Sequence, residues 1–114
     1  AAAVGGRVYA SGGFEPASGA LHGTVECYDP GAGAWAECPA MRMAQGRLCH
    51  ALVAVAGRLY LLGGFRSLAQ GADAERSVER WDPAAASWET LRVAMEDGRG
   101  NFGAGVVAHG PTAA

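Results

Sequence analysis

Lysine is absent from this 114-residue sequence, and all nine of its basic residues are arginine. The arginines are scattered rather than clustered, and the net charge is −2, so no positive stripe is available to bind a phosphate backbone. We therefore expect no nucleic-acid partner. The absence of lysine also means that these residues offer no side-chain amine for acetylation or ubiquitin attachment.

Long hydrophobic runs are also missing. The longest apolar stretch, ALVAVA at residues 51–56, is far shorter than the roughly 20 residues that a membrane-spanning helix needs. No charged segment followed by an apolar segment and a cleavage site is found, so secretion is not indicated. The sequence predicts a soluble chain with no membrane partner.

Cysteine and histidine are too few and too scattered to form a disulfide framework or a metal site. Cys27, Cys38 and Cys49 are an odd number with no CxxC pair, which favours a reducing compartment, and we expect a cytoplasmic location. The three histidines lie in separate parts of the sequence, so neither zinc nor copper has a set of ligands. We expect no metal and no cofactor.

A repeat with a period of about 50 residues is what the sequence does contain. GRVYASGGF at residues 6–14 is matched by GRLYLLGGF at residues 57–65, and VECYDP at residues 25–30 is matched by VERWDP at residues 78–83. Trp35 then corresponds to Trp88, and Arg47 to Arg99. The repeat units span about residues 5–46 and 47–98, and residues 99–114 begin a further unit.

Each unit has the pattern of short β-strands. RVYAS and RLYLL are rich in strand-forming residues and end in glycines, and the runs that end in Asp-Pro alternate in polarity. A fourth strand at residues 47–55 carries mostly small residues, as expected near a crowded central axis. Four antiparallel strands per unit predict an all-β fold, a partial β-propeller of about two blades plus the opening strand of a third. Residues 1–4 and 111–114 are expected to be frayed ends.

The glycine pairs, the tryptophans and the recurring charges all have structural interpretations. No helix follows Gly12-Gly13 or Gly63-Gly64 to bind a phosphate, so these glycines are predicted to supply positive φ and close backbone approach. Trp35 and Trp88 are predicted to pack between blades, and truncating either would cost about 3–5 kcal/mol if it is fully buried. The two repeated Arg/Glu sets, Arg47 with Arg99 and Glu26 with Glu79, are predicted to hydrogen-bond within every blade.

The ordered series Gly-Arg-x-Tyr-x-x-Gly-Gly, Val-Glu-x-aromatic-Asp-Pro, Trp and Met-x-x-x-Arg resembles the kelch repeat, and it does so twice between residues 4 and 99. The amino-acid sequence around Cys38 is most similar to the BTB-kelch group, whose members recruit substrates to cullin-3 ubiquitin ligases. The resemblance implies a protein-interaction module that binds a target peptide, with cullin-3 bound through domains outside these 114 residues. An actin-associated kelch scaffold remains an alternative.

The resemblance also implies a binding face, formed by the loop after each Gly-Gly pair and by the residues after the Met-x-x-x-Arg arginine. Carried over by position, these residues are Phe14, Glu15, Cys49, His50, Phe65, Arg66, Ser67 and Asn101. The phenylalanines are repeated and favour packing, whereas Arg66 and Ser67 differ between units and favour binding. Cys49 is expected to be inert rather than a reactive thiol.

Catalysis is the rival class of function, because some kelch-like propellers are oxidases or epimerases. The sequence has no GxSxG or HExxH motif and no close group of unrepeated carboxylates. No set of residues with catalytic geometry is therefore predicted, and we expect the chain not to be an enzyme.

Overall fold

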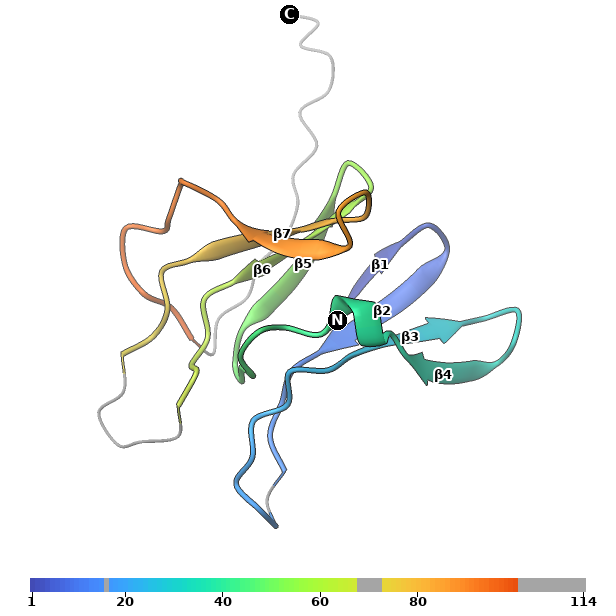
Figure 1. Ribbon diagram of the computed structural model, residues 1–114, viewed down its shortest axis with the longest axis horizontal. Helices are drawn as coiled ribbons and strands as arrows, with labels where there is room; N and C mark the ends of the chain where they lie inside the picture. The colour runs from blue at the N-terminus through green and yellow to red at the C-terminus, as the bar shows by residue number, and fades with distance from the viewer. Residues whose placement is uncertain (16, 68–72, 101–114) are drawn as a thin grey trace, which may run out of the picture.

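The computed structural model describes residues 1–15, 17–67 and 73–100, and within them the chain forms two four-stranded antiparallel sheets (Figure 1). Each sheet follows the order of the sequence, β1-β2-β3-β4 and β5-β6-β7-β8. The strands are β1 Ala2–Val4, β2 Arg7–Ser11, β3 Val25–Asp29, β4 Ala34–Glu37, β5 Ala51–Val55, β6 Arg58–Leu62, β7 Val78–Asp82 and β8 Ser87–Thr90. The predicted all-β fold with two blade-like units is confirmed.

A short 3-10 helix, η1 at Pro39–Met41, follows the first sheet. No helix among the described residues is long and apolar enough to cross a membrane. We call β1 to η1 the first unit and β5 to β8 the second unit. Residues 101–114, which belong to the predicted start of a third unit, lie outside the described residues.

Tight turns close the hairpins because the sequence supplies residues that suit them. Gly5 and Gly6 between β1 and β2 both have positive φ, as do Ala56 and Gly57 between β5 and β6, which matches the backbone twist of two-residue hairpins. Between β3 and β4, the side chain of Asp29 accepts a hydrogen bond from the backbone N–H of Gly31 at 2.9 Å. Asp82 does the same for Ala84 at 3.0 Å, so the repeated Asp-Pro is a repeated turn.

Two sequence-based expectations about strand ends are wrong. Residues 2–4 are not frayed, because β1 pairs with β2 in the register Ala2 to Tyr9 and Val4 to Arg7. The strand expected at residues 47–55 begins only at Ala51. Cys49 has a φ of 57°, which interrupts the extended backbone, so residues 47–50 form a connection instead.

One hydrophobic core joins the two units. Val25, Met41 and Met43 of the first unit and its following loop lie in the same buried cluster as Leu52, Leu59 and Leu61 of the second. Leu61 is completely buried. In Figure 1, β1 lies beside β5, so the first strand of each sheet faces the junction between the units. Because the core spans this junction, each unit depends on its neighbour for burial.

The glycine pairs have the predicted positive φ, and the predicted close approach is found at Gly12 and Gly64. All four glycines have positive φ, between 64° at Gly63 and 103° at Gly13. A Cβ at Gly12 would lie 2.5 Å from the carbonyl oxygen of Arg47, and one at Gly64 would lie 2.6 Å from Cβ of His50. These positions therefore need glycine for both conformation and space.

Gly64→Ala is expected to destabilise the protein by about 2 kcal/mol, because left-handed strain adds to a clash with His50 and Leu48. Gly57→Ala is the matched control, since Gly57 also has positive φ but has open space around its Cβ position. It should cost only the strain, about 1 kcal/mol. Urea denaturation of both variants measures the difference, and equal losses would contradict the close packing at Gly64.

Candidate functional site at the loop end of the sheets

The three long connections of the described chain leave the sheets at the same end. In an antiparallel sheet the short hairpins lie at one end, so the connections at residues 12–24, 38–50 and 63–77 must lie at the other. Figure 1 shows the loops after β2 and β6 extending away from the hairpin turns. We call the surface formed by residues 12–15, 17–24, 44–50, 63–67 and 73–77 the loop end. The predicted binding residues before residue 101 all belong to it.

His50 lies at the centre of the loop end, between the glycine pairs of the two units. Its side chain is close to the Cβ position of Gly12, and its own Cβ is close to that of Gly64. The Nε2 atom of His50 is 2.8 Å from Oγ of Ser11, at the end of β2. This hydrogen bond links the two units, since Ser11 belongs to the first and His50 leads into the second.

The His50 ring is held in its neutral form. Burial, and after it the positive charge of Arg47, lowers its pKa from 6.5 to about 4. A neutral imidazole has one N–H donor and one acceptor nitrogen, so it can pair with the hydroxyl of Ser11 in either tautomer. The ring therefore acts as a polar packing residue near neutral pH.

The stability of the protein should fall as the pH is lowered from about 6.5 to about 4. Over this range the unfolded chain binds a proton at His50 that the folded chain does not bind, so protonation favours unfolding. His50→Gln should reduce the fall in the urea midpoint between pH 7 and pH 4.5, and His22→Gln is the matched control. Equal pH dependence in both variants would contradict a buried neutral His50.

Arg66 joins the loop after β6 to its surroundings through several weak contacts. Its Nε is 3.3 Å from Glu75, one Nη is 3.4 Å from the amide oxygen of Gln45, and the other is 3.9 Å from Glu79. These distances are longer than the 2.7–2.9 Å or so of strong charge-assisted hydrogen bonds. The Arg66 guanidinium is therefore positioned but keeps donor capacity for a further acceptor.

Arg47 lies near Arg66 at the loop end but, unlike Arg66, it is buried. Only 1% of its surface is exposed, and its side chain donates to the carbonyl oxygen of Gly63 at 3.1 Å and pairs with the carboxylate of Glu79. Its own carbonyl accepts a hydrogen bond from Gly13 of the first unit at 2.7 Å. Arg47 thus joins the two units, and its predicted structural role is confirmed in the second unit.

The first unit does not repeat this arrangement. Glu26, which corresponds to Glu79, is exposed and has no ion pair among the described residues. Trp35, which corresponds to Trp88, is 51% exposed. Among the described residues, the aromatic ring that it contacts is Tyr28 of its own sheet. The described residues hold no second sheet beside β4, so the expectation that Trp35 packs between units stays a prediction.

The structure places the other predicted binding residues as follows. Phe14 is 43% exposed and forms an isolated bridge with Leu21, whereas Phe65 is half-buried and bridges to Leu48. The Phe65 ring lies against Gly100, which supports packing for this residue. The remaining residues divide by exposure, with Glu15 and Ser67 exposed and Cys49 and Arg66 half-buried. Asn101 lies outside the described residues.

The loop end brings His50, Phe65 and Arg66 together around the second glycine pair, and their role in binding stays a prediction. Sequence reasoning missed the contact between Ser11 and His50 and the partners of Arg66. One signal was available for Ser11, because the repeat has Leu62 at the corresponding position. A polar residue in place of an apolar one at a strand end indicated a local partner.

The loop end offers little for catalysis. Ser11 and His50 have the geometry of a nucleophile and its base, but a histidine with a pKa of about 4 is a weak base near neutral pH. The three cysteines are free thiols. Within residues 1–15, 17–67 and 73–100, no group of three His, Cys, Asp or Glu side chains could hold a metal ion.

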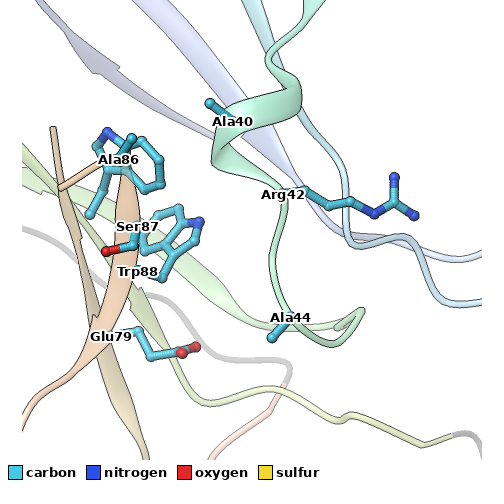
Figure 2. A pocket seen from close by; sticks show the side chains of 8 residues that line it. Ala40, Arg42, Ala44, Glu79, Ala86, Ser87 and Trp88 are labelled. Carbon is cyan, nitrogen blue, oxygen red and sulfur yellow. The ribbon is translucent and has the colours of Figure 1, made fainter.

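A separate cavity of about 270 Å³ lies in the groove between the units, away from the glycine pairs. Figure 2 shows Ala40 and Ala44 on one wall and Trp88 with Glu79 on the other, while the side chain of Arg42 points away. The indole Nε1 of Trp88 donates to the carbonyl oxygen of Met41 at 2.7 Å. The groove is therefore part of the junction between the units.

Comparison with known proteins agrees with this architecture. The family profile of the kelch motif matches residues 1–42 and 46–92, which is one match for each sheet and its following turn. The chain belongs to the kelch-repeat family. The kelch chain is also 40% identical over 88 residues to the human protein "Kelch repeat and BTB domain-containing protein 13".

The matched segment covers 76% of this kelch chain but only 18% of that human relative. The chain therefore corresponds to a small part of the relative's length. Family and relative together support a protein-interaction module for the kelch units.

Proposed function

We propose that this chain is part of a kelch propeller that recognises a short peptide of a protein target on its loop end. The main support is that two polar side chains, Arg66 and His50, lie together at the loop end. Neither residue type recurs at the equivalent position of another unit, although the sheets that hold them are repeated. Exposed Phe14 adds apolar contact area. A scaffold built the same way in each unit with different side chains at one end is suited to specific binding.

The proposal extends to a role as the substrate-recognition part of a cullin-3 ubiquitin ligase adaptor in the cytoplasm. The support is the resemblance to the BTB-kelch group and the BTB domain in the name of the human relative. Cullin-3 would bind through domains outside these residues. The chain itself would catalyse nothing, and recognition would be its entire contribution.

Arg66 is proposed to contact the target directly. Its three contacts are long, so a carboxylate or carbonyl of a target peptide can share its guanidinium without breaking a strong pair. An acidic or carbonyl-rich turn is the kind of peptide segment that fits. Glu75 and Glu79 hold the arginine in place for it.

The test uses a longer protein that contains this sequence, expressed in cells and purified by affinity. Wild-type protein should co-purify cullin-3 and a set of ubiquitinated targets. Arg66→Gln should retain cullin-3 but reduce target recovery at least about tenfold, the loss of one charge-assisted contact. Arg58→Gln is the matched control, since Arg58 is exposed at the opposite, hairpin end.

The adaptor role is wrong if cullin-3 is absent from the wild-type complex. Co-sedimentation with actin filaments without cullin-3 would favour the scaffold alternative instead. Equal target recovery with Arg66→Gln and Arg58→Gln would place target binding away from the loop end.

A further inference from the structure

Two of the free cysteines, Cys27 and Cys38, are neighbours on one face of the first sheet. Cys27 of β3 is paired with Ala36 of β4. Just beyond β4, the backbone N–H of Cys38 donates to the carbonyl oxygen of Val25 at 2.8 Å, which continues the same register. Side chains alternate along a strand, so residues two apart share a face. Cys27 and Cys38 are therefore diagonal neighbours, a relation that the β3–β4 hairpin creates and that their spacing in the sequence does not show.

This face of the first sheet lies against the second unit. Val25 belongs to the core that the two units share, and Cys38 packs against that core. Cys27 is only 7% exposed, whereas Cys38 is half-buried. On the other side of Cys27, β2 places Tyr9 directly opposite. Cys38 is therefore the member of the pair that a reagent in solution reaches first.

The surroundings of the two thiols restrict their chemistry. Burial, and after it the neighbouring Cys27 thiol, raises the pKa of the Cys38 thiol above its usual value. The thiolate and not the thiol is the nucleophile, so Cys38 is poorly suited to catalysis near neutral pH. Closure to a disulfide is the reaction that two adjacent thiols can still undergo, because it needs a thiolate on only one sulfur at a time.

We propose that Cys27 and Cys38 form a reversible disulfide inside the junction between the two units. The oxidant is a small disulfide such as oxidised glutathione. The Cys38 thiolate attacks one sulfur of the oxidant and releases the first glutathione, which leaves a mixed disulfide at Cys38. The Cys27 thiolate then attacks the Cys38 sulfur and releases the second glutathione. Two protein thiols are thus oxidised, one glutathione disulfide is reduced, and the two thiol protons pass to the released glutathione.

Closure of this disulfide acts on the contact between the units. Disulfides join Cα atoms about 4.4–6.8 Å apart, whereas diagonal neighbours on two strands usually lie about 7–8 Å apart, so closure draws Cys38 toward β3. Cys38 immediately precedes η1. The η1 carbonyl of Met41 accepts the indole hydrogen bond of Trp88, so the redox state of the pair is linked to the position of Trp88. This inference does not depend on the proposed peptide binding.

Peptide mapping of a longer protein that contains this sequence tests the proposal. The folded protein is equilibrated with mixtures of reduced and oxidised glutathione, its free thiols are blocked with iodoacetamide, and it is cleaved with trypsin. Because the sequence has no lysine, Cys27 and Cys38 fall in one peptide, residues 8–42, and Cys49 falls in another, residues 48–58. The expected product is peptide 8–42 lighter by two hydrogens, a change that dithiothreitol reverses. Blocked thiols or separate glutathione adducts at Cys27 and Cys38 in every mixture overturn the proposal.

The unfolded chain provides a matched control. Cys38 lies midway in the sequence between Cys27 and Cys49, so in concentrated urea it should pair with either at a similar rate. In the folded protein the Cys27–Cys38 disulfide should exceed the Cys38–Cys49 disulfide at least about tenfold, because the sheet holds Cys27 beside Cys38. The same ratio in folded and unfolded protein overturns the proposal.

Two variants separate closure from its effect on the junction. Cys27→Ser should stop the reaction at the glutathione adduct of Cys38, whereas Cys49→Ser should close as the wild type does. Closure should shift the tryptophan emission maximum of the wild type and of Cys49→Ser, and reduction should reverse the shift. Unchanged emission in the closed protein, or an equal shift in Cys27→Ser, overturns the link to Trp88.

Discussion

Replacing Arg47 with methionine is expected to lower the free energy of unfolding by about 3 kcal/mol. Removing one partner from a buried ion pair costs about 3–5 kcal/mol, because the remaining charge loses its compensation. The lower end applies because Glu79 is 16% exposed and Arg66 stays within 3.9 Å of it. The carbonyl oxygen of Gly63 also loses its donor.

Urea denaturation followed by tryptophan fluorescence at fixed protein concentration gives this value. Arg58→Met is the control, and it should change stability by less than about 0.5 kcal/mol because Arg58 is exposed. The double variant Arg47→Met with Glu79→Leu should recover part of the loss, since no charge is left unpaired by the change. A loss below about 1 kcal/mol for Arg47→Met alone would contradict the buried pair.

Trp88→Ala is expected to cost about 3 kcal/mol, whereas Trp35→Ala should cost less than about 1 kcal/mol in dilute solution. The two residues occupy the same repeat position, but Trp88 is half-buried against η1 while Trp35 is 51% exposed. Tryptophan truncations at buried sites cost about 3–5 kcal/mol, and partial burial places Trp88 at the lower end.

Chemical denaturation at one fixed protein concentration compares the two variants. Trp88→Phe separates packing from hydrogen bonding, because it removes only the indole donor to Met41 and should cost about 1 kcal/mol. Equal losses for Trp88→Ala and Trp35→Ala would show that the two positions have the same environment, contrary to the structure.

The repeat in the sequence was sufficient to predict most of the strands, because the runs at β2 and β6 are rich in strand-forming residues and end in glycines, and those at β3 and β7 alternate in polarity and end in Asp-Pro. Positive φ at Gly12-Gly13 and Gly63-Gly64 and the turn after Asp29 follow from local chemistry, and both are found. Such features need only a few neighbouring residues.

What the repeat could not show is where two equivalent residues differ. Trp35 and Trp88 are identical in type and position, and only the presence of a neighbouring sheet decides which of them is covered. The strand end at Ala51 was also missed, because the positive φ of Cys49 comes from the packing of residues 47–50 between the glycine pairs and not from cysteine itself.

The candidate site was predicted in outline only. The loop after each glycine pair could be assigned from the resemblance, but the contact of Ser11 with His50 joins residues 39 positions apart. The partners of Arg66 likewise come from the loop before β5, the loop before β7 and β7 itself. Long-range pairs of this kind depend on how two sheets meet, which periodicity within one sheet does not specify.

The two backbone hydrogen bonds that hold the glycine pairs provide separate reporters of opening. The Gly13 amide is bonded to Arg47, so its hydrogen exchange measures how often the two units part. The Gly64 amide is bonded to Arg99, so its exchange measures how often the residues after the second sheet lift away. The exchange rates of these two amide protons therefore distinguish separation of the two units from local opening of the residues that follow the second sheet.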